Sequence, residues 1–210
     1  MSDHTEHIDL NAIDMSLKEL LTEMKDISEV VVDLAYAALM FDSVDIAQEV
    51  SHLEDDMEDL RYAIRIKAML AARSKDDAMQ LSGLLQIATA AGDIAGAAEE
   101  IVSLLEFPLE QRPFLSFILK ESEEKIRMTH ISPESEMVNH TIGELGVESN
   151  TGMRIIAIKG RHGWIYDPEP DIKLRPRDAI IVRGTEDGFR ELSLYASGAE
   201  PWVLEVSEDG

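Results

Sequence analysis

Five carboxylates stand close together in the first half of the chain, and their spacing suggests metal chemistry. They are Glu54, Asp55, Asp56, Glu58 and Asp59. On a helix, Asp55 and Asp59 share a face because they are four residues apart, and Glu54 and Glu58 do the same. Such carboxylates could bind a divalent or iron cation, since oxygen ligands suit these ions. The alternative hypothesis is a solvated polar face on an amphipathic helix.

Basic side chains that could bind an anion lie in the second half. Arg154 begins a predicted strand, and Arg161 and His162 lie in a predicted hairpin turn. The whole chain has a net charge of −23, so local cations must hold any anionic ligand against the general field. The same charge predicts that nucleic acid is not a partner, because its phosphates are repelled.

Motifs typical of enzymes are absent from the sequence. No Gly-x-Gly-x-x-Gly follows a predicted strand, and no Gly-x-x-x-x-Gly-Lys-Ser/Thr occurs. The serines lack a plausible His and Asp constellation for nucleophilic catalysis. The chain has no cysteine, which excludes disulfides and thiolate metal sites. We predict that the protein is not an enzyme.

The elements that must position these residues change in type near Pro113. Before it, three segments carry apolar residues at alternate steps of three and four, which is typical of packed helices. Short connections near Phe41–Ser43 and Arg73–Asp76 force neighbouring helices to be antiparallel. The predicted fold of this half is all-α, an antiparallel three-helix bundle, with Ser43 as the N-cap of the second helix.

The third predicted helix carries a second apolar stripe. Ile87, Ile94 and Ile101 are seven residues apart and lie beside the seam that faces the other helices. One bundle cannot cover both stripes. We therefore expect a homodimer through the helical half.

The second half is predicted to be a small α+β module. The segments KIRMTHIS, MRIIAIK, WIYDP and DAIIVRG are expected strands, and a final helix is capped by Thr185. The segment HTIGELGVES is expected to form one or two helical turns, with Gly146 just beyond the helix end. The resulting order is β-α-β-β-β-α. Asp178 is expected to cap a turn by accepting hydrogen bonds from amides two residues further on. Trp164 is interpreted as core or dimer packing, with a stacking platform as the alternative.

These elements predict a domain organisation of four parts. A helical bundle spans 12–108, a connector with a short helix 109–124, an α+β domain 125–198 and an acidic tail 199–210. The chain shows no secretory signal and no run of eighteen apolar residues, so no transmembrane segment is expected. We expect a cytoplasmic protein that reaches the membrane only through a partner.

The helical half resembles a PhoU-like domain. The segment DIAQEVSHLEDDMEDLRYAIRIKAM is similar to its second helix, and LQIATAAGDIAGAAEEI is similar to the partner helix. The resemblance implies acidic E(D)xxxD motifs that bind metal, with Glu54, Asp55, Asp59 and Asp93 as ligands. Thr89 stands where the second motif should open with an acid, so that motif is incomplete. The alternative function implied is a metal-binding signalling adaptor for phosphate uptake.

The strand-rich half resembles the TrkA-C domain, the C-terminal lobe of RCK-type regulators of potassium transport. The residues that carry the resemblance include Thr141-Ile142-Gly143-Glu144-Leu145, Ile156-Ala157-Ile158-Lys159, Trp164-Ile165-Tyr166-Asp167-Pro168, Asp171, Leu174, Asp178 and Ile181-Val182-Arg183-Gly184. Pro176-Arg177 departs from the pattern, where a glycine is usual beside the aspartate. The resemblance implies a domain that dimerises, in some members around a cyclic dinucleotide. On their positions alone, Arg154, Arg161 and His162 are the candidate residues for such an anionic ligand. It implies a soluble regulatory subunit of a cation, most directly potassium, transport system, acting on a membrane channel or transporter in trans.

Overall fold

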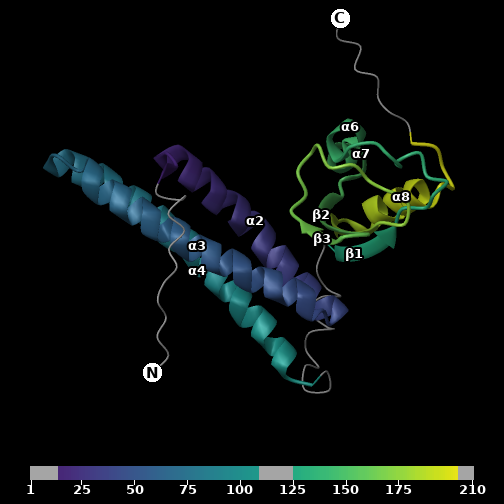
Figure 1. Ribbon diagram of the computed structural model, residues 1–210, viewed down its shortest axis with the longest axis horizontal. Coiled ribbons are helices and arrows are strands. Elements are labelled where there is room, and N and C mark those ends of the chain that lie inside the picture. The colour runs from purple at the N-terminus through teal and green to yellow at the C-terminus, as the bar shows by residue number, and fades with distance from the viewer. Residues whose placement is uncertain (1–13, 109–124, 203–210) are drawn as a thin grey trace, which may run out of the picture. The chain divides into compact units, whose positions relative to one another are not determined.

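The computed structural model describes residues 14–108 and 125–202. The chain divides into two compact units, Met1–Pro108 and Leu109–Gly210. The first unit is helical and the second is built on a sheet (Figure 1). The predicted connector and all but the first residues of the predicted acidic tail lie outside the described residues.

Three long helices form the described part of the first unit, residues 14–108. They are α2 (Leu17–Phe41), α3 (Val44–Ala71) and α4 (Lys75–Ser103), and a single 3-10 turn, Leu104–Glu106, follows α4. Each helix begins after a serine whose hydroxyl accepts a hydrogen bond from the amide three residues further on. These serines are Ser16, Ser43 and Ser74, so the predicted N-cap at Ser43 is confirmed.

The core of the first unit lies between all three helices, which contact one another in pairs. Large side chains such as Leu34 on α2 and Ile64 on α3 are fully buried. The inner face of α4 carries mainly alanine, and its buried Gly92 packs against the side chain of Arg61 on α3. Small residues there let the helices approach closely. The predicted three-helix bundle is confirmed.

A four-stranded antiparallel sheet forms the second unit, in the order β1-β4-β2-β3. The strands are β1 (Lys125–His130), β2 (Arg154–Gly160), β3 (Gly163–Tyr166) and β4 (Ala179–Gly184). β2 and β3 form a hairpin in which Gly160 pairs with Gly163, and β3 lies at one edge of the sheet. The hairpin tip therefore projects from the end of an edge strand.

Within residues 125–202, the helices of the second unit are α6 (Ile142–Leu145), α7 (Val147–Thr151) and α8 (Glu186–Ser197). The predicted order β-α-β-β-β-α is confirmed. The expected one or two helical turns are the two short helices α6 and α7, and Gly146, the predicted residue at the helix end, takes a left-handed conformation with φ 53° and ends α6. Thr185 caps α8 as predicted, its hydroxyl accepting a hydrogen bond from the Gly188 amide.

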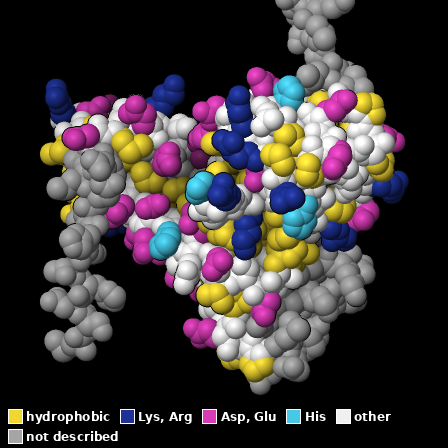
Figure 2. All heavy atoms as spheres, turned by 45° about the vertical axis from the view of Figure 1, so that its right-hand side comes forward, with side chains coloured by type: hydrophobic (Ala, Val, Ile, Leu, Met, Phe, Trp, Pro, Cys, Tyr) yellow, Lys and Arg dark blue, Asp and Glu magenta, His cyan; other side chains and the backbone are white. Residues whose placement is uncertain are grey.

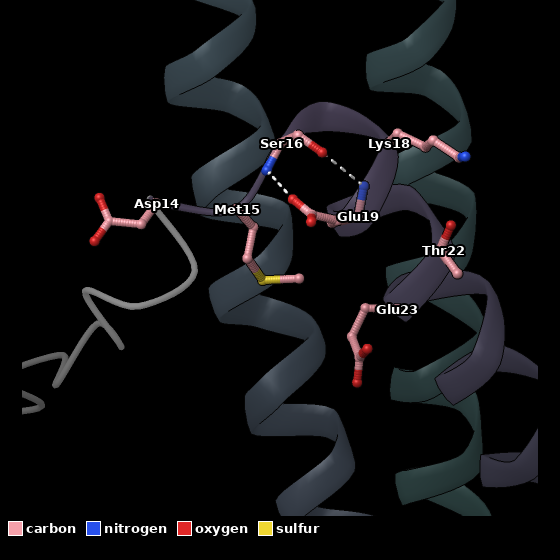
Figure 3. A pocket seen from close by; sticks show the side chains of 7 residues that line it. All are labelled: Asp14, Met15, Ser16, Lys18, Glu19, Thr22 and Glu23. Carbon is pink, nitrogen blue, oxygen red and sulfur yellow. Dashed lines mark hydrogen bonds between the residues drawn. The ribbon is translucent and has the colours of Figure 1, made fainter.

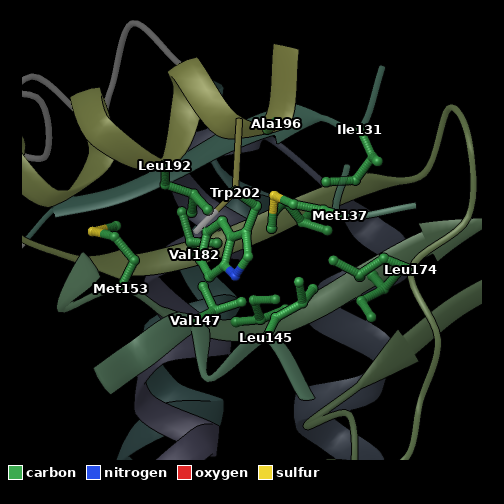
Figure 4. Packing of buried hydrophobic residues seen from close by; sticks show 13 residues of the cluster. Ile131, Met137, Leu145, Val147, Met153, Leu174, Val182, Leu192, Ala196 and Trp202 are labelled. Atoms are coloured by element: carbon green, nitrogen blue, oxygen red, sulfur yellow. The ribbon is translucent and has the colours of Figure 1, made fainter. Parts of the chain in front are cut away.

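One aliphatic cluster holds the second unit together (Figure 4). Leu192 and Ala196 of α8 pack with Val182 of β4, and Trp202 inserts its indole among them. Tyr195 meets the Trp202 ring edge to face, with 4.8 Å between the centroids. This core includes Ile158 of β2, Ile180 of β4 and Leu174, so it also holds in place the loop before β4, which contributes to the candidate site.

Candidate functional site

A hollow of about 450 Å³ lies between the β2–β3 hairpin tip and the segment 172–178 of the second unit. Its lining combines cationic, apolar and acidic side chains. The lining residues are Ile158, Gly160, Arg161, His162, Gly163, Trp164, Ile165, Ile172, Lys173, Arg175 and Asp178. We call this hollow the basic groove. Figure 2 shows Lys, Arg and His side chains, with hydrophobic ones between them, gathered on the face of the second unit turned toward the viewer.

The basic groove has an aromatic wall at the edge strand. Trp164 is half-buried, and its ring stacks on Tyr166 with 5.8 Å between centroids and an interplanar angle of 17°. The ammonium of Lys159 lies 5.1 Å from the centre of the Trp164 ring. The indole Nε1 has no hydrogen-bond partner among the residues that the structure describes. The ring is thus a half-exposed surface, intermediate between the core packing we expected and the stacking platform that was the alternative.

Asp178 stabilises the turn at residues 175–178, which lines the groove opposite the hairpin tip. It is buried, with 5% of its surface exposed, and its carboxylate accepts a hydrogen bond of 2.9 Å from the amide of Arg175. Our expectation that Asp178 caps amides two residues further on is therefore wrong in direction. The bond runs backwards because Arg177 is left-handed, with φ 72°, and turns the chain so that the carboxylate meets the preceding residues. The carboxylate is committed to the turn.

Two of the three residues predicted to bind an anion meet in the groove. Arg161 and His162 are exposed at the hairpin tip and line it. Arg154 lies at the other end of β2, six residues from Gly160, or roughly 20 Å at the rise of a strand. Its guanidinium is 3.2 Å from the Asp167 carboxylate. Arg154 is thus separated from the groove.

Sequence reasoning missed Lys173 and Arg175. Both line the groove, and Arg175 precedes the buried Asp178 by three residues. The signal was present in the run Lys173-Leu174-Arg175-Pro176-Arg177, which concentrates cations in a loop of an acidic chain. What the run does not reveal is that the loop lies against the β2–β3 tip.

The four predicted metal ligands lie on α3 and α4. Glu54 and Asp59 are half-buried on α3, whereas Asp55 on α3 and Asp93 on α4 are exposed. Within the described ranges, no group of three or more His, Asp or Glu side chains has the arrangement of a metal site. Where the incomplete motif lacks its acid, the Thr89 hydroxyl donates to the carbonyl of Leu85 in its own helix. These residues as placed do not fit a multinuclear metal cluster, and we assign no metal chemistry to them.

Glu54 is nevertheless in an unusual environment. Burial raises its pKa above the ordinary glutamate value, and the nearby carboxylates of Glu99, Glu58 and Asp55 raise it further. Arg61 opposes this shift. Glu99 belongs to α4, so acidic side chains of two helices face one another here.

A second hollow, of about 640 Å³, lies at the start of α2 (Figure 3). Two of its polar residues cap the helix: the Glu19 carboxylate accepts from the Ser16 amide at 2.6 Å, and the Ser16 hydroxyl accepts from the Glu19 amide at 3.2 Å. The hydrogen bond from the Ser16 backbone holds the pKa of Glu19 below its usual value. This hollow is explained by local helix capping.

Family models match both units in the predicted order. The PhoU domain model matches residues 21–105, and the TrkA-C domain model matches residues 130–196. Both are regulatory domains. No helix among the residues placed by the structure is long and apolar enough to cross a bilayer.

A curated relative and several solved structures are similar to parts of the chain. Potassium channel protein 1 of Methanocaldococcus jannaschii is 28% identical over 85 residues, which are 40% of this chain and 25% of the relative. The chain thus spans about a quarter of the length of that relative. The RCK_C domain dimer of S. agalactiae BusR in complex with c-di-AMP is 28% identical, covering 37% of this chain and 95% of that one, with a TM-score of 0.34.

The potassium transport protein KtrA gives a similar result. Its RCK C domain in complex with cyclic diadenosine monophosphate is 24% identical, covering 40% of this chain and 95% of that one, with a TM-score of 0.33. The family models and the order of elements agree on the composition of the chain. Residues 21–105 are similar to a PhoU domain, and residues 130–196, further along the chain, are similar to a TrkA-C domain.

Proposed function

We propose that this protein is a regulatory subunit of a cation transport system, most directly one for potassium, and that its basic groove binds a small anionic ligand. The TrkA-C match and the curated potassium channel relative support the transport assignment. The chain would act in trans on the cytoplasmic side of a membrane channel or transporter. No catalytic step is required for this role.

The basic groove is the observation that carries the proposal. Arg161, His162, Lys173 and Arg175 converge on it in a chain whose net charge is −23. The single acidic side chain in its lining, Asp178, is buried and bound to the backbone. Guanidinium groups suit phosphates because their planar N–H donors match phosphate oxygens. The groove is therefore an anion site in a protein that otherwise repels anions.

The size and the aromatic wall of the groove favour a nucleotide-like ligand. A volume of 450 Å³ falls in the range, about 300–1,000 Å³, of small-molecule sites. The Trp164 ring lines the groove and is half-exposed, with Tyr166 and Lys159 already against it. A base could stack on the part of the ring that they leave open, and base–aromatic stacking contributes roughly 1–3 kcal/mol. A cyclic dinucleotide supplies both phosphates and bases. If two copies of the second unit pair, a ligand with two-fold symmetry would contact both grooves.

Ligand binding would regulate transport by shifting a conformational equilibrium. A ligand that prefers one arrangement of two paired chains increases the population of that arrangement, by no more than its difference in affinity. The transporter would then respond to the arrangement, not to the ligand itself. Ligand binding would therefore be coupled to transport by the difference between the ligand's affinities for the two arrangements, which can be measured.

Thermal unfolding followed by tryptophan fluorescence tests the ligand class. Both tryptophans, Trp164 and Trp202, belong to the second unit, so the signal reports its unfolding alone. Cyclic dinucleotides at 100 times their dissociation constant should stabilise it by about 2.7 kcal/mol. At the same ligand concentration, a tenfold weaker affinity in Arg175→Ala should lower this stabilisation to about 1.4 kcal/mol or less. Arg190→Ala is the matched control, because that guanidinium pairs with Asp187 on α8 at 2.7 Å. Equal shifts in both variants, or none with any nucleotide, would refute the ligand assignment.

A further inference from the structure

α4 carries a second apolar seam on its exposed side. The seam advances by alternate steps of four and three residues, the pattern of a helix that packs against another helix. Its members are Gly83, Ile87, Ala90, Ile94, Ala97 and Ile101. Ile87 is 63% exposed and Ile94 41% exposed, whereas Ala88, Ala95 and Ala98 of the same helix face the bundle core. We call these six residues the outer seam.

The outer seam alternates small and large residues, and this alternation selects one kind of partner. If two copies of α4 cross antiparallel about a two-fold axis at residue 92, every layer holds one isoleucine and one small residue. Ile87 meets the partner's Ala97, Ile94 meets the partner's Ala90, and Ile101 meets the partner's Gly83. A parallel pair would instead stack Ile on Ile and Ala on Ala, which leaves voids at the small layers and costs stability. When two copies of the outer seam run antiparallel, the large residues of each copy face the small residues of the other.

The same axis accounts for exposed hydrophobic residues at both ends of α4. Met79, near its N-terminus, is 67% exposed, and Met69 and Leu70 at the end of α3 are 65% and 77% exposed. Leu104 and Phe107, beyond the C-terminus of α4, are 39% and 50% exposed. In the antiparallel pair, Met79 comes level with residue 105 of the partner. Two apolar patches that are far apart in one chain thus come together in the dimer.

The contact has the size of a specific but modest interface. The outer seam from Gly83 to Ile101 is about 27 Å long at 1.5 Å per residue, and a helix is about 10 Å wide. Such a strip removes on the order of 500 Å² per copy from water, about 1,000 Å² in total, which is near the lower limit for specific interfaces. The patches at both ends add to this area.

We propose that the occupant of the outer seam is the α4 helix of a second copy of this chain, in antiparallel orientation. The inference does not depend on the ligand proposed above, since it concerns the helical unit alone. Charge limits the affinity of this dimer. Asp93 lies one residue from the two-fold axis, so two like charges approach there, and self-association should strengthen as salt screens them.

Disulfide cross-linking of the full chain tests both the pairing and its direction. The protein has no cysteine, so introduced ones are its only thiols. The double variant Ile87→Cys/Ala97→Cys should form a covalent dimer on mild oxidation, because each cysteine faces the other type in the partner. Within one chain the two positions are about 15 Å apart, too far for a disulfide. Each single variant should stay uncross-linked, because its two copies are equally distant.

Two results would overturn the proposal. A double variant that stays monomeric on a non-reducing gel, with a helical circular dichroism spectrum, would rule out the interface. A single Ile87→Cys variant that cross-links as efficiently would show a parallel pair. A second measurement uses size: Ala90→Phe should weaken the contact and lower cross-linking in the double variant at least tenfold. Ala78→Phe, exposed on α4 but outside the seam, should leave it unchanged.

Discussion

Replacing Gly188 by alanine should destabilise the second unit, although helix propensity alone favours the change. Gly188 lies in the first turn of α8, where alanine is better than glycine by up to about 1 kcal/mol. In the structure, however, a Cβ at this position would overlap the carbonyl oxygen of Thr151 and lie 3.2 Å from the sulfur of Met153. The backbone oxygen cannot rotate away, so α8 must move away from α7. Overpacking of this kind costs about 1–3 kcal/mol, and we expect a net loss of about 1–2 kcal/mol.

This loss of unfolding free energy can be measured because the unfolding of the second unit has its own spectroscopic signal. Both tryptophans belong to the second unit, so tryptophan fluorescence follows its unfolding alone. For a unit of about 100 residues, 1 kcal/mol corresponds to roughly 4–8 °C in midpoint. We therefore expect Gly188→Ala to lower the fluorescence midpoint by about 5–15 °C. Gly96→Ala is the matched control, because Gly96 on α4 has open space around its Cβ position and should only gain stability.

The Gly188 prediction fails if the variant is as stable as the natural protein or more stable. That result would mean that α8 and α7 are not in the close contact described. A fall in the helical signal of the first unit with no change in tryptophan fluorescence would also contradict it. Gly96→Ala should leave the fluorescence midpoint unchanged, since it lies in the other unit.

Three further predictions concern charge, backbone and metal. Glu54→Gln should raise the unfolding midpoint of the helical unit at pH 7, because a glutamate whose pKa is raised by burial and neighbouring carboxylates destabilises the fold when it is ionised. This gain should vanish below pH 4.5, the ordinary pKa of glutamate, and a gain in circular dichroism melts that does not change with pH would contradict the prediction. Arg177→Gly should stabilise the second unit by about 0.5–1 kcal/mol, because φ 72° is strained for arginine and free for glycine; Arg177→Ala should show no such gain in the fluorescence melt. Adding Mn²⁺ or Fe²⁺ should shift the helical midpoint equally in the natural protein and in Asp55→Asn/Asp59→Asn, and a shift confined to the natural protein would restore the metal site.

Local rules predicted the elements well because their causes are local. Ser43 and Thr185 cap their helices through hydroxyls that reach amides three residues further on. Gly146 ends a helix because it adopts a left-handed conformation at no steric cost. Alternating apolar residues specified the strands, and steps of three and four specified the bundle. Each of these sequence patterns depends only on residues that are close together along the chain.

The candidate site was only half predictable because it is assembled by tertiary contact. Arg161 and His162 were placed correctly in a hairpin turn, but Arg175 reaches the same hollow from a loop that follows β3. The length of β2 alone separates Arg154 from Arg161, which strand geometry could have shown in advance. The strained turn at Arg177 explains why glycine is usual in the related pattern there, although no rule of composition reveals its effect on Asp178.

Isothermal titration of the full chain with a cyclic dinucleotide tests the proposed function most directly. We expect saturable binding that weakens at least tenfold in Arg161→Ala and in Arg175→Ala, with a stoichiometry of one ligand per two chains. Arg190→Ala should bind like the natural protein. Two results would contradict the assignment of the basic groove as a regulatory anion site. One is an affinity that neither groove substitution changes, and the other is no binding of any cyclic dinucleotide or mononucleotide by the natural protein.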